Sequence, residues 1–306
     1  MMLLIQGTTI VECYTILSNN RETSDIIATC SVNEIRLWNI PKSKELVRIQ
    51  VPNLECNCVC FSPSGSAVIS GWSDGKIRAF GPQSGKLLFV INDAHKVIGQ
   101  KKPTGALSGV TAIEVTNDNK GIISGGSDGV VRAWKISKGS QTLAATMKEH
   151  NATINCIIVR KDDSECVSAS DDGTCIVWNL SRYSRQNIMY QQTYFKSVAF
   201  LNDESQMVTT GSDKKVTYWD ALECNAIREL DCAEQGEIYA LDLAPNGDMF
   251  VTGGQAKDVN IWHYDNGEII KVGKAHSGNI TKTRFSPDGK FVVSVGDEGA
   301  ICVWSM

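Results

Sequence analysis

One short phrase returns seven times in this chain of 306 residues: apolar or β-branched residues that lead into an aromatic residue. Successive aromatic residues are 42, 54, 44, 41, 43 and 42 positions apart. A period in the low forties with one such strand in each unit is typical of propeller blades, which are four-stranded sheets arranged around a central axis. The aromatic residues that end the seven phrases are Trp38, Phe80, Trp134, Trp178, Trp219, Trp262 and Trp304.

The repeat also predicts the domain organisation. Seven units of about 44 residues account for the whole chain, so we expect a single all-β domain over residues 1–306, a seven-bladed β-propeller. The 26 glycines and 7 prolines suit short strands joined by tight turns. A fold of this kind usually offers its surface to other proteins.

The chain end predicts how the ring closes. Only two residues follow Trp304, so the seventh unit lacks an outermost strand of its own. The apolar start of the chain can supply that strand and cover an edge with unpaired backbone groups. We therefore expect residues 2–6 to pair antiparallel with residues 300–304.

Charge and composition exclude several classes of partner. The net charge is −4, whereas a nucleic-acid surface is normally strongly basic. The apolar start is too short for a signal peptide, and no stretch reaches the roughly 18 apolar residues of a membrane helix. We expect no nucleic-acid, membrane or small-molecule partner. Because a closed ring has no need to self-associate, we expect a monomer.

The eleven cysteines do not form a disulfide or metal pattern. Cys56, Cys58 and Cys60 alternate within one expected strand, so all three should point to one face and cannot pair with one another. The sequence contains no Cys-x-x-Cys and only four histidines. We expect reduced, buried thiols in a cytosol-like compartment, with no metal and no cofactor.

Four polar or aromatic residues recur at fixed spacing. In the fourth unit His150 lies 28 residues before Trp178, Ser168 lies ten before it and Asp172 six before it. These offsets resemble those of the WD-repeat family over the full length of the chain. The resemblance implies a buried hydrogen-bond chain in which the aspartate contacts the histidine, the histidine the serine, and the serine the indole N–H. Burial of such polar atoms is tolerable because each has a partner.

Other units keep this pattern in part. Residues at matching offsets are Ser124, Asp128 and Trp134 in the third unit, with His95 displaced; Thr209, Asp213 and Trp219 in the fifth; and His276, Ser294 and Trp304 in the seventh, with Glu298 at the aspartate offset. The first unit has Trp38 alone, and Phe80 of the second has no N–H to donate. We expect packing to hold these weaker units. Because serine, histidine and aspartate recur beside a tryptophan, they indicate architecture rather than a hydrolase triad, and there is no Gly-x-Ser-x-Gly elbow.

Two features exceed what the repeat requires. The third unit has about 11 extra residues after His95, and the segment 96–105 includes Lys96, Lys101 and Lys102. This loop could face an acidic partner, and the alternative is a solvated loop. Trp72 occupies an offset where other units have glycine or serine, so it could contact a partner near the central opening or serve as additional core.

Several longer stretches resemble a narrower group of WD-repeat proteins of cilia and flagella. They include residues 71–80, 91–95, 165–178 and 275–281. Members of that group carry two tandem propellers, so the resemblance implies that this chain covers the C-terminal one. It also implies a non-enzymatic scaffold in the cytoskeleton of the axoneme, in the lumen of the doublet microtubule near its inner junction. Its partners would be tubulin and other inner-junction or luminal proteins.

Two other functions remain open from the sequence. Many propellers are substrate receptors or adaptors of ubiquitin ligases or other cytosolic complexes, but those usually carry Trp-Asp-x-Arg, and the arginine is missing after Trp38, Trp178 and Trp219. An enzyme would need ionisable groups that converge at one point of the central channel. The sequence shows only repeated structural ones.

Overall fold

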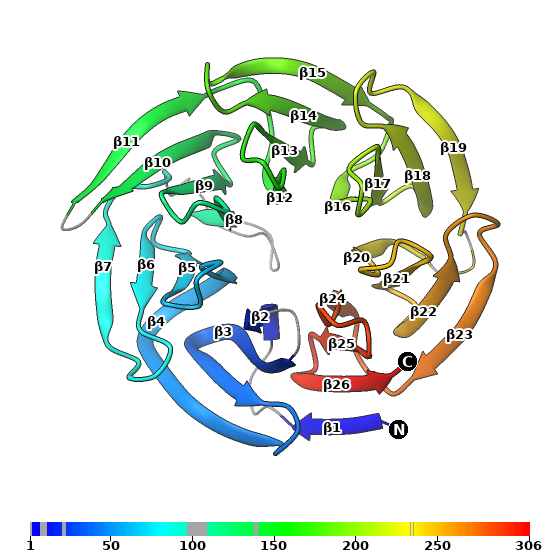
Figure 1. The fold of residues 1–306 in the computed structure, drawn as a ribbon, viewed down its shortest axis with the longest axis horizontal. Coiled ribbons are helices and arrows are strands. Elements are labelled where there is room, and N and C mark those ends of the chain that lie inside the picture. Colours follow the sequence, from blue (N-terminus) through cyan, green and yellow to red (C-terminus); the bar gives the residue numbers. More distant parts are fainter. Residues whose placement is uncertain are drawn as a thin grey trace.

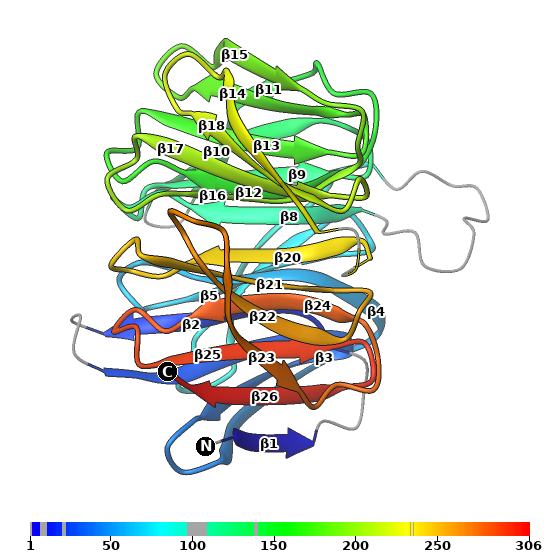
Figure 2. The same ribbon diagram turned by 90° about the vertical axis from the view of Figure 1, so that its right-hand side faces the viewer.

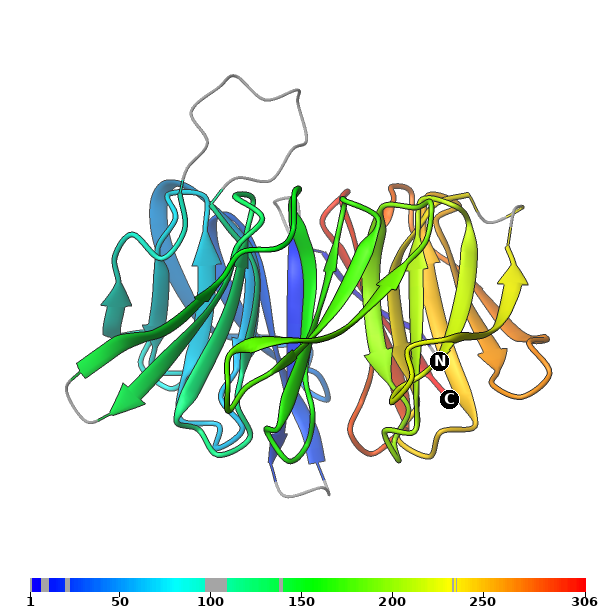
Figure 3. The same ribbon diagram turned by 90° about the horizontal axis from the view of Figure 1, so that it is seen from above.

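The strands form a ring of sheets around a central axis (Figure 1). This computed structural model describes residues 2–6, 11–19, 23–96, 109–137, 140–232, 234 and 236–306, with side chains described from residue 26 onward. Each sheet starts with a strand at the axis and ends with a strand at the outer rim. Seen from the side, the strands of each sheet connect the two faces of the ring, so the turns gather on those faces (Figure 3).

Five sheets have four strands each, which follow one another from the axis outward. They are β8 (Val110–Val115), β9 (Gly121–Gly126), β10 (Val131–Ser137) and β11 (Ser140–Met147); β12 (Ile154–Val159), β13 (Glu165–Ser170), β14 (Thr174–Asn179) and β15 (Ser184–Tyr190); β16 (Phe195–Phe200), β17 (Gln206–Gly211), β18 (Lys215–Asp220) and β19 (Ala226–Asp231); β20 (Ile238–Leu243), β21 (Met249–Gly254), β22 (Asp258–His263) and β23 (Ile269–Lys274); and β24 (Ile280–Phe285), β25 (Phe291–Gly296), β26 (Ala300–Ser305) and β1 (Met2–Gln6).

The remaining sheet corrects the predicted number of blades. It contains β2 (Val11–Asn19), β3 (Thr23–Asn39), β4 (Lys44–Phe61), β5 (Val68–Trp72), β6 (Ile77–Phe80) and β7 (Leu87–Ile91). The described residues thus form six sheets, so the prediction of seven separate four-stranded blades is wrong. The first two sequence units share one sheet.

The reason for this merger is the long strand β4. Its first half pairs with β3 and its second half with β5, and the chain bends between them at Asn53, which has a φ of 62°. The backbone N–H of Asn53 donates to Oδ1 of Asn33 at 2.6 Å, which holds the bend. The spacing of the aromatic residues does not reveal this merger, because it gives the number of repeat units and not which strands pair within one sheet.

The N-terminal strand closes the ring as expected. β1 pairs antiparallel with β26, from Met2 opposite Trp304 to Gln6 opposite Ala300. Figure 2 shows β1 lying along β26 on the outside of the last sheet. The predicted pairing of residues 2–6 with residues 300–304 is therefore confirmed.

The apolar core lies between neighbouring sheets. One cluster joins Val167 of β13 to Phe195 of β16 and Trp219 of β18, and Phe195 and Trp219 meet edge to face with ring centroids 6.4 Å apart. Burial decreases toward the rim: five of six residues of β13 are buried, whereas β15 buries one residue. The strand phrase of the sequence is therefore apolar because both of its faces are covered.

Hydrogen bonds along the central channel join consecutive sheets. Each innermost strand has a bulge near its start. Beside it, Asn57 Nδ2 donates to the carbonyl of Val110 at 2.8 Å, and Asn155 Nδ2 donates to the carbonyl of Phe195 at 2.7 Å. Thr111 Oγ1 donates in the same way to the carbonyl of Ile154 at 2.5 Å. We call these three bonds the channel latches.

The turns after the innermost strands make a second set of links. Asn119, Asp163 and Glu204 have left-handed backbones with φ values of 60°, 59° and 58°, a conformation that favours glycine. Their side chains accept N–H groups of the preceding turn, for example that of Ser64 at 2.9 Å from Asn119 and that of Lys161 at 2.8 Å from Glu204. These bonds compensate for the backbone cost of about 1 kcal/mol. Among the described residues, no helix is long and apolar enough to cross a membrane.

Removal of β1 should destabilise the ring. Deletion of residues 1–6 leaves β26 as an unpaired edge, so we expect the melting temperature to fall by roughly 5–10 °C and association to increase. Differential scanning calorimetry and sedimentation velocity measure the two effects. Deletion of Met1 alone is the control and should change neither. An unaltered melting curve for the longer deletion would show that the pairing contributes no stability.

Candidate functional site

The polar residues of the fourth unit form one buried chain of hydrogen bonds. His150 Nδ1 lies 2.9 Å from Asp172 Oδ2, and His150 Nε2 lies 2.7 Å from Ser168 Oγ. Trp178 Nε1 donates to Ser168 Oγ at 2.8 Å. A carboxylate only accepts, so His150 Nδ1 carries a proton and donates it to Asp172, while Nε2 is hydrogen-bonded to the serine hydroxyl. Every atom of the chain thus has a partner and none is left to act as a nucleophile.

The third and seventh units contain the same chain. His95 Nδ1 lies 2.9 Å from Asp128 and His95 Nε2 lies 2.8 Å from Ser124, although His95 is displaced in the sequence. In the seventh unit His276 Nδ1 lies 2.6 Å from Glu298 and Nε2 lies 2.7 Å from Ser294. Trp134 and Trp304 donate to the serines of their units at 2.9 and 2.8 Å.

Burial and charge set the protonation of the third-unit chain. Burial opposes ionisation of Asp128, but hydrogen bonds from His95, Arg132 and the backbone N–H of Lys96 outweigh it, so the pKa of Asp128 is far below its usual value. Burial lowers the pKa of His95, against the attraction of Asp128, and the Arg132 charge lowers it further. The folded protein therefore holds an ionised aspartate beside a neutral histidine.

Threonine replaces serine in the fifth and sixth units. Trp219 donates to Thr209, and Trp262 donates to Thr252, both at 2.8 Å. Asp213 does not contact a histidine; its backbone N–H donates to Thr193 Oγ1 at 3.1 Å, and burial raises the pKa of its carboxyl.

In the first unit, Trp38 has a hydrogen-bond partner that does not lie at the expected offset of ten residues. Trp38 Nε1 donates at 3.0 Å to Thr29 Oγ1, which lies nine residues earlier. In place of histidine and aspartate, Arg36 Nε donates to Glu34 Oε1 at 2.7 Å, and both side chains are only 8% exposed. A shorter turn, with Asn33 at a φ of 69°, accounts for the altered spacing.

The structure places Trp72 in the core and corrects the prediction of an exposed contact. Its side chain is fully buried, and its Nε1 donates to Ser70 Oγ at 2.8 Å. The Arg78 guanidinium lies 5.4 Å from the Trp72 ring and pairs with Asp74 at 2.6 Å. Trp72 thus supplies the indole that Phe80 lacks, and Arg78 pairs with Asp74 as Arg132 does with Asp128 in the third unit. The retained Ser70 beside a phenylalanine was the sequence signal for this exchange.

The lysine-rich insertion is described only at its start. Lys96 is exposed, and its backbone N–H donates to Asp128 Oδ2 at 3.3 Å. Lys101 and Lys102 lie outside the described residues, as does the rest of segment 97–108.

The ten described cysteines are free thiols, and nine of them are buried. Burial raises the pKa of Cys302 to about 11, so this sulfur is a thiol at neutral pH. The expectation that Cys56, Cys58 and Cys60 share one face is wrong. A bulge lies between Cys56 and Cys58, so Cys56 packs in the cluster with Trp72 while the other two pack in the next cluster. No group of three possible metal ligands occurs among the described residues.

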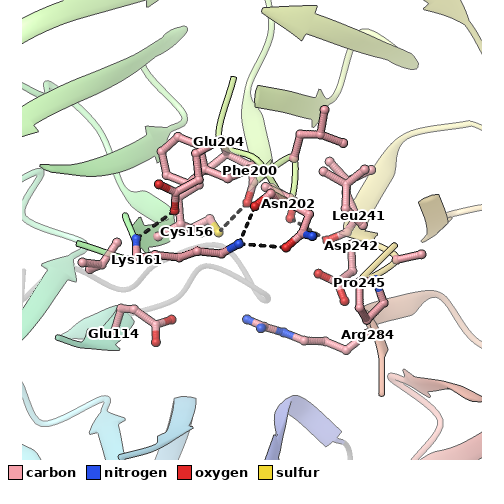
Figure 4. A pocket seen from close by; sticks show the side chains of 18 of the residues that line it. Glu114, Cys156, Lys161, Phe200, Asn202, Glu204, Leu241, Asp242, Pro245 and Arg284 are labelled. Carbon is pink, nitrogen blue, oxygen red and sulfur yellow. Dashed lines mark hydrogen bonds between the residues drawn. The ribbon is translucent and has the colours of Figure 1, made fainter. Parts of the chain in front are cut away.

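One mouth of the central channel holds a cavity of about 310 Å³ that sequence reasoning missed. It opens beside the turns that follow the innermost strands, and Figure 4 shows Arg284 and Lys161 pointing into it. Lys161 Nζ donates to Asn202 Oδ1 at 2.7 Å. Asp242 accepts the backbone N–H of Phe285 at 2.7 Å, and burial raises the pKa of Asp242 against the charge of Arg284. These residues lie on separate units, so no local motif marks them.

The charges in this cavity balance. Three cationic side chains, Lys161, Lys282 and Arg284, line it together with the carboxylates of Glu114, Glu204 and Asp242. The cavity can accommodate a polar segment of a partner, but it lacks an activated nucleophile with a positioned base.

Comparison with known proteins agrees with the repeat pattern. The family described as WD domain, G-beta repeat matches residues 46–80, 100–135, 141–179, 224–263 and 267–305. Cilia- and flagella-associated protein 52 from Chlamydomonas reinhardtii is 50% identical over 283 residues, and that from Homo sapiens is 43% identical over 282 residues. In both cases the match covers 92% of this chain and 44% of the relative, so the chain spans less than half their length. Apoptotic protease-activating factor 1 from Rattus norvegicus is 27% identical over 260 residues, 80% of this chain and 19% of that protein.

A double-mutant cycle tests the role of Trp72. Trp72→Gly should lower the free energy of unfolding by about 3–5 kcal/mol, because it empties a core site and removes the donor to Ser70. Adding Phe80→Trp restores the glycine–tryptophan pair seen at Gly126 and Trp134. The double variant should therefore recover at least about 1 kcal/mol beyond additivity in urea denaturation. Strict additivity would show that the two aromatic residues do not substitute for each other.

The stability should fall with acid through His95. Its pKa is lower in the folded protein, so its contribution is complete above the unfolded value of about 6.5 and is lost as the pH falls below it. The depressed pKa of Asp128 and of Asp172 adds a second loss below about pH 4. Urea denaturation between pH 8 and pH 3 measures both. In the His95→Gln variant, the free energy of unfolding should fall less steeply with decreasing pH just below pH 6.5. An equal slope in the variant and in the unaltered protein would contradict this assignment.

Proposed function

The chain belongs to the WD domain, G-beta repeat family, and we propose that it is a non-enzymatic scaffold of the doublet microtubules of motile cilia and flagella. The observation that carries the proposal is 43–50% identity to cilia- and flagella-associated protein 52 over 92% of the chain.

The finer location that we propose is the lumen of the doublet, near the inner junction. There the chain would contact tubulin and other inner-junction or luminal proteins, as the C-terminal propeller of a longer two-propeller protein. The relatives are more than twice as long as the matched part, which is consistent with such a second portion. The insertion that begins at Lys96 would face an acidic partner.

The use of polar residues supports a role in binding rather than catalysis. In each described Ser–His–carboxylate set, a tryptophan N–H donates to the serine hydroxyl, and both ring nitrogens of the histidine are hydrogen-bonded. A hydrolase would need one such serine to be exposed, and Ser124, Ser168 and Ser294 are fully buried. The polar chemistry of the repeats therefore holds the sheets together.

Recovery with doublet microtubules tests the proposal. We expect the purified chain to co-sediment with isolated ciliary doublets and less with microtubules assembled from tubulin alone, because the luminal partners are present only in doublets. The measurement is the bound fraction against free protein at increasing salt. Sedimentation of the chain without doublets controls for non-specific pelleting. Absence from doublets, with enrichment on cullin adaptor proteins, would favour the ubiquitin-ligase alternative.

A further inference from the structure

The outer strand β23 differs from the other strands at the rim. All its residues except the half-buried Gly273 are exposed, and Ile269, Ile270 and Val272 are 42%, 44% and 47% exposed. Figure 1 places β23 at the periphery of the ring. In the described part of the chain it pairs with β22 alone, so its second edge offers backbone N–H and C=O groups.

The backbone of β23 is held firmly enough to act as a template. Five residue pairs join it to β22, from Asp258 opposite Lys274 to Trp262 opposite Ile269. Gly273 lies against the ring of Trp304 in the next sheet, so closely that a Cβ at this position would be 2.6 Å from that ring. The strand is therefore ordered while its side chains remain in solvent.

Its charge distinguishes β23 from the other outer strands. Lys271 and Lys274 give it a net charge of +2, and Lys274, whose side chain is 75% exposed, pairs with Asp258 at 3.6 Å. β7 and β11 have no charged residues. The basic residues of β15 and β19 already have partners within the chain: Arg185 pairs with Glu149 at 2.6 Å, and Arg228 stacks on Tyr218 at 3.9 Å.

We propose that β23 binds an extended acidic segment of a partner protein, which adds to the sheet as a further strand. The backbone edge would supply the hydrogen bonds and the three aliphatic side chains the apolar contact. Lys271 and Lys274 are three positions apart and lie on opposite faces of the strand. They select a segment with two carboxylates at the same spacing and β-branched residues between them.

The same lysines disfavour a second copy of this chain as the occupant. Opposite residues of an antiparallel pair share a face of the sheet, so two β23 strands centred on Lys271 or on Lys274 would set that lysine against its own counterpart. Like charges directly opposite one another destabilise a sheet. The charge of β23 therefore disfavours pairing with a second copy of this strand and favours pairing with an acidic strand.

The test uses the intact chain and the fluorescent peptide Glu-Thr-Val-Glu-Val-Thr, acetylated and amidated at its ends. We expect saturable binding by fluorescence anisotropy that weakens with salt, together with protection of β23 amides from hydrogen exchange. Lys271→Glu with Lys274→Glu should weaken binding by roughly tenfold or more. The same double variant should bind the charge-reversed peptide, with lysine in place of glutamate, better than the unaltered protein does.

Two controls separate this mode from general attraction of charges. Lys42→Glu with Lys86→Glu removes two exposed lysines elsewhere and should leave the affinity unchanged. A peptide N-methylated at every residue keeps the carboxylates but has no backbone N–H to donate from either edge, so it should not bind. Equal binding by the β23 and control variants, binding of the methylated peptide, or concentration-dependent dimers in sedimentation velocity would overturn the proposal.

This inference rests on the proposed scaffold function but fails separately from it. If the peptide does not bind while the chain still co-sediments with doublets, β23 is not a docking strand and the scaffold stands. If the peptide binds as described and the doublets do not, the acidic partner belongs to another assembly.

Discussion

The ring depends on satisfying polar groups where consecutive sheets meet. In each channel latch, a side chain of one sheet donates a hydrogen bond to a backbone carbonyl of the next sheet, beside a bulge in the innermost strand. Farther along, Asn119, Asp163 and Glu204 accept backbone N–H groups from the preceding turn. Sheet packing through apolar side chains alone would allow the sheets to slide, whereas these directional bonds fix the position of each sheet.

Inside each sheet the same requirement is met by different residues. A serine or threonine accepts an indole N–H from Trp178 in one unit and from Trp72 in another, although the two tryptophans occupy different strands. Arginine–carboxylate pairs, Arg36–Glu34 and Arg78–Asp74, occur in the first two units, which lack the histidine. The fold therefore constrains the presence of a donor and an acceptor more than the identity of the residues, since an unpaired buried polar atom costs about 1–3 kcal/mol.

These requirements leave the outer surface free for recognition. The second and third strands of the sheets are covered on both faces, so the variable contacts lie on the turns, in the channel mouth and along the outer strands. A scaffold can thus change its partners by altering β23 or the insertion at Lys96 without loss of the core.

The period along the chain predicted the repeated all-β units and the closure by residues 2–6, and the resemblance to the WD-repeat family predicted the histidine chains, because these features are local or periodic. They could not predict the shared sheet of the first two units, since that depends on the bend of β4 at Asn53. Nor could they decide between a surface contact and a core position for Trp72, or predict the convergence of Lys161, Asp242 and Arg284 on one cavity. Those residues come from different sheets, and only tertiary packing sets the distance between side chains that are far apart in the chain.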